Sequence, residues 1–349
     1  MSWGDKIKIS LFGESHGEAI GVVIEGLPAG FKPDLEKVAL MMRRRAPGNF
    51  PWATSRKEPD EPRIISGFFN GAFTGAPLTA LIANTNTRST DYAALAATPR
   101  PGHADYAASI RYNSANDPRG GGHFSARLTA PLVFAGALAQ QILAAQDIAI
   151  TARILEIAGI ADPAPAAPPF NVAHKDFPCA DDTAAAAMIA AIADAHARRD
   201  SVGGIVEVAA VGFPAGIGDP FFGKLDAKIA GLLMTLPAVK AVEIGAGFAA
   251  ARSTGSANND QTFFNERGAI ARATNNAGGI EGGISNGEPI IVRAAFKPTP
   301  SISAPQRAVN LADRATTTIE IHGRHDPCVV PRAVPVVEAA LALALFDAL

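Results

Sequence analysis

The sequence has 349 residues and is 48% hydrophobic, which is enough for a large core in one domain or two. It holds 31 Lys and Arg against 33 Asp and Glu, so its overall charge gives no reason to expect binding to nucleic acid or to a membrane surface. Its two cysteines, Cys179 and Cys328, argue against a disulfide framework and favour a reducing, cytoplasmic compartment.

The first predicted element is a short strand over 7–10, and a glycine-bracketed polar motif follows it. There Glu14, Ser15 and His16 stand between glycines. Two interpretations are open. The motif is either a tight turn or an active-site loop whose glycines let the backbone lie close to a ligand.

Strands and helices alternate through the rest of the first half. Asp34 can accept hydrogen bonds from the first turn of a helix that begins at residue 35. The predicted elements are strands at 19–26, 62–69 and 76–86, a short helix at 104–112, and a long apolar helix at 125–147.

The second half continues with a strand over 148–160 and an alanine-rich helix over 181–200. The chain ends in an apolar stretch over 334–349. Glu338 and Asp347 interrupt this stretch, so we expect a core or interface helix and no membrane span.

Three stretches of the second half resemble stretches of the first half in the same order. Pro28-Ala29-Gly30 matches Pro214-Ala215-Gly216, 70–85 resembles 281–296, and 100–106 is echoed at 324–330. This order predicts an internal duplication. We therefore expect one domain, 1–349, made of two pseudo-twofold repeats at roughly 7–146 and 200–349 that 147–199 joins.

Arginines cluster where the first helix is expected to end. Arg43, Arg44 and Arg45 are consecutive, so they point around the helix and at least one must face the protein body. A solvated helix end explains one or two of them. The arginine fork also suits a carboxylate or phosphate, so an anion-binding role is equally open.

Other loops combine glycine with histidine and cationic residues. His103 follows Pro-Gly, and three glycines separate Arg119 from His123 just before a helix, where free N–H groups can meet a phosphate. The glycine pairs within 278–287 suit either a flat ligand or hairpin turns. Together these loops predict a site for a small polyanion with groups for proton transfer.

Two common classes of site have no sequence support. No CxxC or HExxH spacing occurs, so we expect no structural metal site. No GxGxxG motif follows a strand and no Walker motif is present, which disfavours ordinary nucleotide-binding loops.

The motifs GESHG, RRRxPG, RPGHADY, SAR, GGIxGGISNG, KPTxS and RHDPC occur in the order, and with nearly the spacing, of the chorismate synthase family. The sequence resembles that family from Gly13 to the last helix. The resemblance implies an α+β fold, a β-α-β sandwich with helices between antiparallel sheets, in a homotetramer. It also implies a lyase that removes phosphate from 5-enolpyruvylshikimate-3-phosphate by 1,4-anti elimination, giving chorismate. This is the last common step of the shikimate pathway, and it needs reduced FMN without net redox change.

The resemblance also implies roles for individual residues. His16, His103 and Asp326 match catalytic residues: one histidine protonates the leaving phosphate, the other protonates or holds the flavin, and the aspartate helps flavin N5 accept the substrate proton. The residues implied for substrate binding are Ser15, Arg44, Arg45 and Arg127. Those implied for FMN binding are His123, Phe124, Ser125, Pro237, Ala238, Gly282, Lys297, Pro298, Thr299, Pro300, Ser301 and Arg324.

The sequence departs from the family pattern in two loops. His123 stands where the family usually has arginine and Leu128 where it has glutamate, and 50–52 lacks the arginine usual after RRRxPG. Some members reduce FMN with NADPH themselves. No large insertion is evident in this chain, so we expect it to receive reduced FMN from elsewhere.

Two rival functions stay open from the residues. One is a flavin oxidoreductase with net hydride transfer, which the missing dinucleotide motif disfavours. The other is a non-catalytic anion-binding protein, which the altered SAR region favours.

Overall fold

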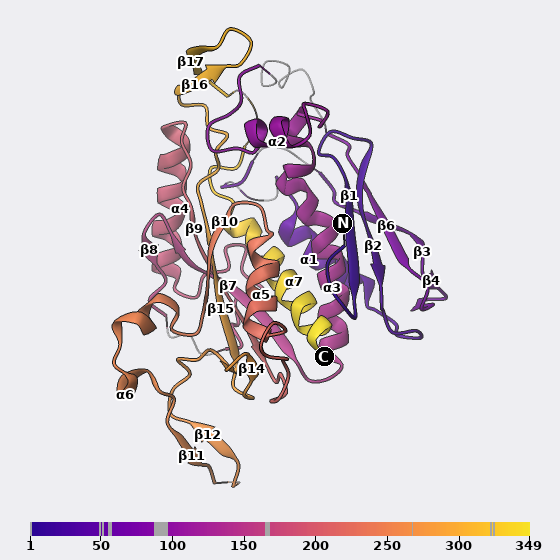
Figure 1. Ribbon diagram of the computed structural model, residues 1–349, viewed down its shortest axis with the longest axis vertical. Helices are drawn as coiled ribbons and strands as arrows, with labels where there is room; N and C mark the ends of the chain where they lie inside the picture. The colour runs from indigo at the N-terminus through magenta and orange to yellow at the C-terminus, as the bar shows by residue number, and fades with distance from the viewer. Residues whose placement is uncertain are drawn as a thin grey trace.

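The computed structural model describes residues 2–48, 50, 52–54, 58–86, 97–164, 168–266, 268–321, 323 and 325–349. Within this part of the chain, two antiparallel sheets enclose a layer of helices (Figure 1). The first sheet has the order β1 (Lys8–Gly13), β2 (Ala19–Glu25), β6 (Leu78–Ala83), β3 (Pro62–Ser66). The second has the order β10 (Val239–Ile244), β15 (Ile290–Phe296), β9 (Gly204–Val211), β7 (Ala149–Ile157), β8 (Ile160–Ala161). The α+β fold class expected from the sequence is confirmed.

Four helices form the middle layer: α1 (Leu35–Arg45), α3 (Thr129–Ala144), α5 (Leu225–Met234) and α7 (Val330–Ala348). α3 packs on the first sheet, α7 packs on the second, and the two helices pack on each other. Both are mainly apolar on all sides because neighbours cover most of their surface, and the buried charges of α7, Glu338 and Asp347, are paired. At their crossing, a Cβ on Gly136 would lie 2.3 Å from the Cβ of Ala339, so only glycine fits there.

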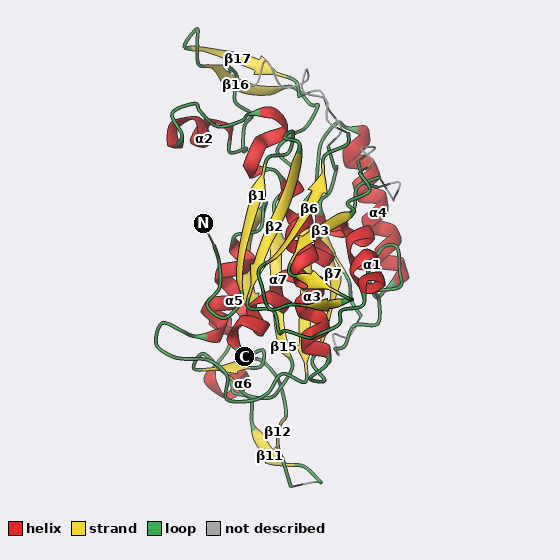
Figure 2. Cartoon of the chain, turned by 90° about the vertical axis from the view of Figure 1, so that its right-hand side faces the viewer, coloured by secondary structure: helices red, strands yellow, loops and turns green. Residues whose placement is uncertain are grey.

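Smaller elements lie at the periphery. The helices are α2 (Asp105–Arg111), α4 (Asp182–Ala197) and α6 (Gly255–Asn258). The short hairpins are β4 (Phe68–Phe69) with β5 (Ala72–Phe73), β11 (Thr262–Phe264) with β12 (Ile270–Arg272), β13 (Ile280–Glu281) with β14 (Ile284–Ser285), and β16 (Gln306–Asn310) with β17 (Ala315–Ile319). The β11–β12 and β16–β17 arms extend from opposite ends of the molecule (Figure 2).

Capping and buried charge explain how the helices are fixed. Asp34 caps α1 by accepting hydrogen bonds from the N–H groups of Glu36 and Lys37, as predicted. Asp347 near the end of α7 is buried and accepts from three N–H groups in residues 5–7. The C-terminal helix is therefore a core helix that ties down the N-terminus. No helix in the described ranges is long and apolar enough to span a bilayer.

A ladder of alternating charge crosses four strands of the second sheet. Arg153, Glu207, Arg293 and Glu243 occupy directly opposite positions on β7, β9, β15 and β10. Glu207 is fully buried and accepts from Arg153 Nε at 3.0 Å and from Arg293 Nε at 2.8 Å. A slip of one residue would break these contacts, so the ladder fixes the strand register.

The two halves have the same topology. The order β1-β2-β6-β3 corresponds to β7-β9-β15-β10, and α1 and α3 correspond to α5 and α7. Both Pro-Ala-Gly turns make the same contact: Gly30 N–H donates to Phe73 O, and Gly216 N–H donates to Ser285 O, each at 2.8 Å. These matches support our proposal of two copies of one ancestral unit within a single domain. Because β7, the counterpart of β1, lies within the predicted joining segment 147–199, the second copy begins near residue 149 and not at 200.

Candidate active site

A cavity of about 780 Å³ opens where the two repeats meet. Its walls come from β1, the ends of α1 and β15, the starts of α3 and α7, the C-terminal end of α5, and the loop before α2. The cationic side chains along it are Arg45, Arg100, Arg127, Lys297 and Arg332. A cavity with this lining suits a ligand that carries several negative charges.

Most of the site residues predicted from the sequence line this one cavity. They are Arg45, His103, His123, Phe124, Ser125, Arg127, Pro237, Ala238, Lys297, Thr299, Pro300, Ser301 and Asp326. They come from distant parts of the chain, and the fold brings them together.

Ser15 and His16 lie one layer behind the wall. A Cβ added to Gly120, which lines the cavity, would lie 2.5 Å from His16 Cδ2 and 2.9 Å from Ser15 Oγ. The Ser15 N–H donates to Gly122 O at 3.1 Å, so the first glycine motif and the glycine turn before α3 interlock. Gly120 has φ of 60°, and its missing side chain is the space that His16 occupies.

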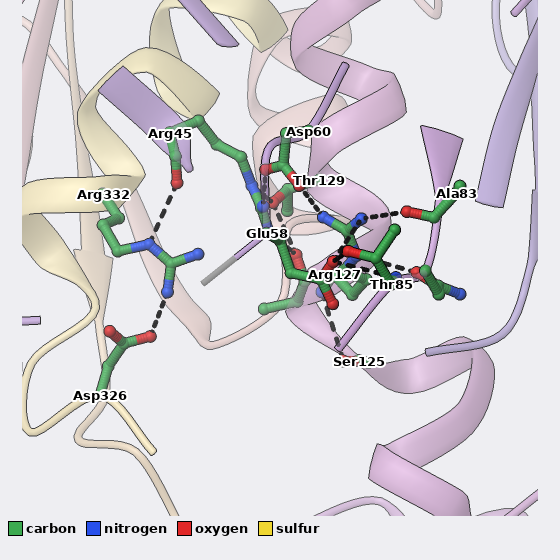
Figure 3. Close-up of polar contacts among 12 residues, drawn as sticks. Arg45, Glu58, Asp60, Ala83, Thr85, Ser125, Arg127, Thr129, Asp326 and Arg332 are labelled. Atoms are coloured by element: carbon green, nitrogen blue, oxygen red, sulfur yellow. Dashed lines mark hydrogen bonds and ion pairs between the residues drawn. The ribbon is translucent and has the colours of Figure 1, made fainter. Parts of the chain in front are cut away.

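Two predicted substrate arginines share one buried carboxylate (Figure 3). Asp60 accepts from Arg45 Nη1 at 2.6 Å through Oδ2 and from Arg127 Nη1 through Oδ1. Arg45 also donates to Thr129 Oγ1 and to Ala126 O. Asp60 is 1% exposed and has φ of 52°, a backbone conformation that non-glycine residues rarely adopt outside constrained sites.

Electrostatics keep this cluster charged. Burial lowers the pKa of the Arg45 guanidinium to about 10, which still leaves it protonated at neutral pH. Burial alone would raise the pKa of the Asp60 carboxyl, but the charges of Arg45 and Arg127 outweigh burial and hold that pKa below its ordinary value. The cluster is therefore a fixed arrangement in which two cations share Asp60, and a second buried carboxylate, Glu58, lies 4.0 Å from Arg127 Nη2.

Asp326 lines the same cavity and is also held in place (Figure 3). Its Oδ1 accepts from the Thr54 N–H at 2.9 Å, and its Oδ2 accepts from Arg332 Nη1. Arg332 Nε in turn donates to Arg45 O at 3.0 Å. Arg332 thus connects Asp326 with the backbone of the helix end that carries Arg45.

His103 is paired with a carboxylate behind the wall. Its Nδ1 lies 2.6 Å from Asp105 Oδ1. Burial alone would raise the pKa of Asp105, but hydrogen bonds from Arg100 and His103 lower it below its ordinary value. Arg100 also donates to Ser301 Oγ at 3.0 Å, which joins this loop to the segment after β15.

The turn before α3 is a 3₁₀ segment, Arg119–Phe124, shaped by glycines with positive φ. His123 Nδ1 lies 3.2 Å from Gly13 O, so this residue, where the family usually has arginine, contacts the first glycine motif. Ser125 accepts from the Arg127 N–H at 3.3 Å and caps the next turn.

The segment after β15 presents polar groups to the same cavity. Lys297 donates to Gly102 O, next to His103. Thr299 also lines the cavity. Among the described residues, the buried hydroxyls of Thr299 and Ser15 have no hydrogen-bond partner. Buried hydroxyls are normally satisfied, so the Thr299 hydroxyl has capacity for a ligand, whereas Ser15 is fully buried behind the wall.

Besides Ser15 and His16, four predicted residues are absent from the cavity lining. Arg44 donates to Glu338 at 2.7 and 3.1 Å, a contact between α1 and α7. Gly282 lies in the turn of the β13–β14 hairpin. The next residue, Gly283, accepts a hydrogen bond from the first N–H of α5. The cavity meets the opposite, C-terminal end of α5, about 15 Å away along the helix. Pro298 is absent from the wall, and Arg324 lies outside the described residues.

Sequence reasoning did not single out four residues that organise the site: Asp60, Arg100, Asp105 and Arg332. Arg100 and Asp105 belong to the RPGHADY motif, so the motif could have identified them as site residues. Among the described residues, no group of three or more His, Cys, Asp or Glu could hold a metal ion.

Comparisons with known proteins agree with this geometry. The sequence model of the family described as chorismate synthase matches residues 7–349. A chorismate synthase from Methanosarcina acetivorans is 47% identical over 99% of this chain and 94% of its own length, and one from Thermococcus kodakarensis is 44% identical over 99% and 96%. A crystal structure of chorismate synthase superposes with a TM-score of 0.78 at 29% identity, covering 99% of this chain and 92% of the other. The chain therefore belongs to the chorismate synthase family.

Proposed function

We propose that this protein is a chorismate synthase, a lyase that eliminates phosphate from 5-enolpyruvylshikimate-3-phosphate in the presence of reduced FMN. The observation that carries the proposal is the cavity at the meeting point of the repeats. It joins cationic side chains with histidine and aspartate side chains able to move protons. The full-length family match supports the same reaction.

The charge of the cavity suits this substrate, which carries one phosphate and two carboxylates. Arg45 and Arg127 are held rigidly by Asp60, so they are preorganised for anions and need little rearrangement on binding. Arg100, Lys297 and Arg332 add positive charge along the wall. Arg44 is not in our proposed set, since its guanidinium pairs with Glu338.

The elimination breaks the C–O bond to phosphate and removes a proton from the carbon in the 1,4 relation. We assign the proton for the departing phosphate to His16 and contact with the flavin to His103, and Asp326 would assist removal of the substrate proton. Asp326 accepts hydrogen bonds from Thr54 and Arg332, which keep its carboxylate facing the cavity.

Reduced FMN fits the residues that are present. The buried Thr299 hydroxyl lacks a partner within the described chain, and Lys297 lies beside it for an anionic group. The residues that would hold the flavin are His123, Phe124, Ser125, Pro237, Ala238, Lys297, Thr299, Pro300 and Ser301. When bound, the flavin supplies transient electron density to the allylic system, and the protein positions it and excludes water.

The direct test supplies purified protein with reduced FMN and the enolpyruvyl substrate under anaerobic conditions. We expect release of phosphate, and we expect His16→Ala to nearly abolish it. Full turnover without flavin, or consumption of one NADPH per product, would favour a different reaction.

We propose that reduced FMN reaches this enzyme from another source. At 349 residues the chain has no large insertion that could house a reductase site. NADPH plus oxidised FMN should therefore support no turnover anaerobically, whereas chemically reduced FMN should support it. Equal rates in the two assays would show an intrinsic reductase.

We also propose a cytoplasmic homotetramer. Phe221, Phe222 and Phe264 are 84%, 99% and 77% exposed, and large apolar side chains left in water commonly mark interfaces. Cys179 and Cys328 are buried, and burial raises the pKa of both thiols to about 12, which suits a compartment where thiols stay reduced. Light scattering should give four chains for the wild type and fewer when both Phe221 and Phe222 are changed to serine.

A further inference from the structure

We infer that Asp105 is a positioning residue that holds His103 in one tautomer, with the proton on Nδ1 and Nε2 presented toward the cavity. The inference rests on the proposed role of His103 in the active site. Asp105 itself does not line the cavity, so it acts through the histidine.

The contact distances place the shared proton. His103 Nδ1 and Asp105 Oδ1 are 2.6 Å apart, a separation that needs a hydrogen between the two atoms. The carboxyl is ionised, since its pKa is lowered below the ordinary value despite burial. Arg100 Nη2 also lies 3.1 Å from Nδ1, but it donates to Asp105 Oδ1 at 2.8 Å and the Nδ1–Oδ1 separation is the shortest of the three. We therefore place the hydrogen on Nδ1, with Asp105 as its acceptor.

The carboxylate cannot turn away, because Arg100 grips both of its oxygens. Arg100 Nε donates to Oδ2 at 2.7 Å and Nη2 donates to Oδ1 at 2.8 Å, while the Arg100 backbone N–H donates to Oδ2 at 3.1 Å. This bidentate fork is the strongest geometry for an arginine–carboxylate pair. The guanidinium is anchored at its far side by Ser301.

The other ring nitrogen lies beside Gly121, where the lack of a side chain leaves it space. A Cβ on Gly121 would approach His103 Nε2 and Cε1 to 3.2 Å each, and Gly121 has φ of 84°, which favours glycine. His103 is among the residues that line the cavity. A ring with Nδ1 protonated can accept a proton at Nε2 and return it, and the carboxylate stabilises the imidazolium that forms in between.

The first experiment reads the tautomer directly, without flavin or substrate. Wild-type protein labelled with ¹⁵N-histidine is compared with Asp105→Asn by long-range ¹H–¹⁵N spectra, and the His103 signals are assigned by their loss in His103→Gln. We expect a protonated Nδ1 in the wild type. In Asp105→Asn the amide must turn its NH₂ toward Arg100 or toward the ring, so the preference for Nδ1–H should be lost.

The second experiment is kinetic. Asp105→Asn should lower kcat roughly 100-fold with KM changed less than about threefold, since loss of a carboxylate behind a functional imidazole costs at least this much. Asp105→Glu should restore part of kcat and the Nδ1–H signal. If Asp105→Asn does not fold, Asp105→Glu carries the test through the tautomer readout.

A matched control is Asp194→Asn, which removes another carboxylate, on α4, that is paired with an arginine, Arg198, outside the cavity lining. It should leave the His103 spectrum and kcat unchanged. An Nε2-protonated His103 in the wild type, or wild-type kcat and tautomer in Asp105→Asn, would overturn the inference. An inactive wild type with the expected tautomer would instead refute the proposed function and leave the positioning intact.

Discussion

Asp60→Asn is the substitution whose effect the structure constrains most closely. The change keeps the size of the side chain and removes its charge. It leaves Arg45 and Arg127 buried beside a neutral amide, which can accept through one oxygen only. We expect the enzyme to lose stability and to bind its anionic substrate with misplaced arginines.

The magnitude follows from burial. The side chains of Asp60, Arg45 and Arg127 are 0%, 4% and 4% exposed, so water cannot replace the lost contacts. Removing one partner of a buried ion pair typically costs about 3–5 kcal/mol of unfolding free energy. An exposed pair is worth about 0–1 kcal/mol, and Asp194→Asn, which breaks the exposed contact with Arg198, is the matched control.

The assay is thermal and urea unfolding of both variants at neutral and at acidic pH. The folded pKa of Asp60 is lowered, so its contribution is present above the unfolded value of about 3.9 and is lost as pH falls through the folded pKa. The gap between wild type and Asp60→Asn should therefore narrow only below about pH 4. A loss under about 1 kcal/mol at pH 7, or a gap that narrows between pH 7 and 5, would refute the reasoning.

Three further substitutions test other parts of the structure. Glu207→Gln should cost about 3–5 kcal/mol of unfolding free energy, measured by urea titration, because it leaves two arginines of the strand ladder without their shared buried partner. Gly120→Ala should nearly abolish turnover because the new Cβ would collide with the His16 ring. Gly30→Ala is the control: Gly30 also has a positive φ, but no atom lies near the position of the added Cβ, so this variant should lose stability without losing turnover. Arg332→Met should lower kcat more than it raises KM, because Asp326 loses a hydrogen-bond donor. Steady-state kinetics measures both constants, and an effect on KM alone would contradict this prediction.

Local patterns predicted the elements well. The cap at Asp34, the alternation of strands and the mainly apolar helices each depend on neighbours in sequence, and each is present in the structure. The order of the three internal matches predicted a duplication, and the corresponding strand orders of the two sheets support that proposal. These features follow from hydrophobic period and turn chemistry, which a sequence displays directly.

The arginine run shows what a helical period can add. Adjacent residues on a helix point about 100° apart, so Arg44 and Arg45 cannot share one ligand face. Val38, Met41 and Met42 are buried, and Arg45 continues their i, i+3, i+4, i+7 stripe into the protein. This period could have separated the cavity arginine from Arg44, whose partner lies on α7.

Other features of the site depend on contacts that no local pattern encodes. Asp60 meets Arg127 across 67 residues, and Arg100 meets Ser301 across 201. Gly282 is a different case. Its hairpin has the Gly-Gly turn that two-residue loops favour, so turn chemistry accounts for this glycine pair, and its contact with the flavin stays a prediction.

The central claim is an elimination without net oxidation or reduction, carried out in the cavity between the two repeats. Its most direct test is an anaerobic stoichiometry with limiting reduced FMN. We predict many equivalents of chorismate and an equal amount of phosphate per flavin, with the flavin still reduced when the substrate is exhausted. One equivalent of oxidised flavin formed for each product molecule would contradict the account.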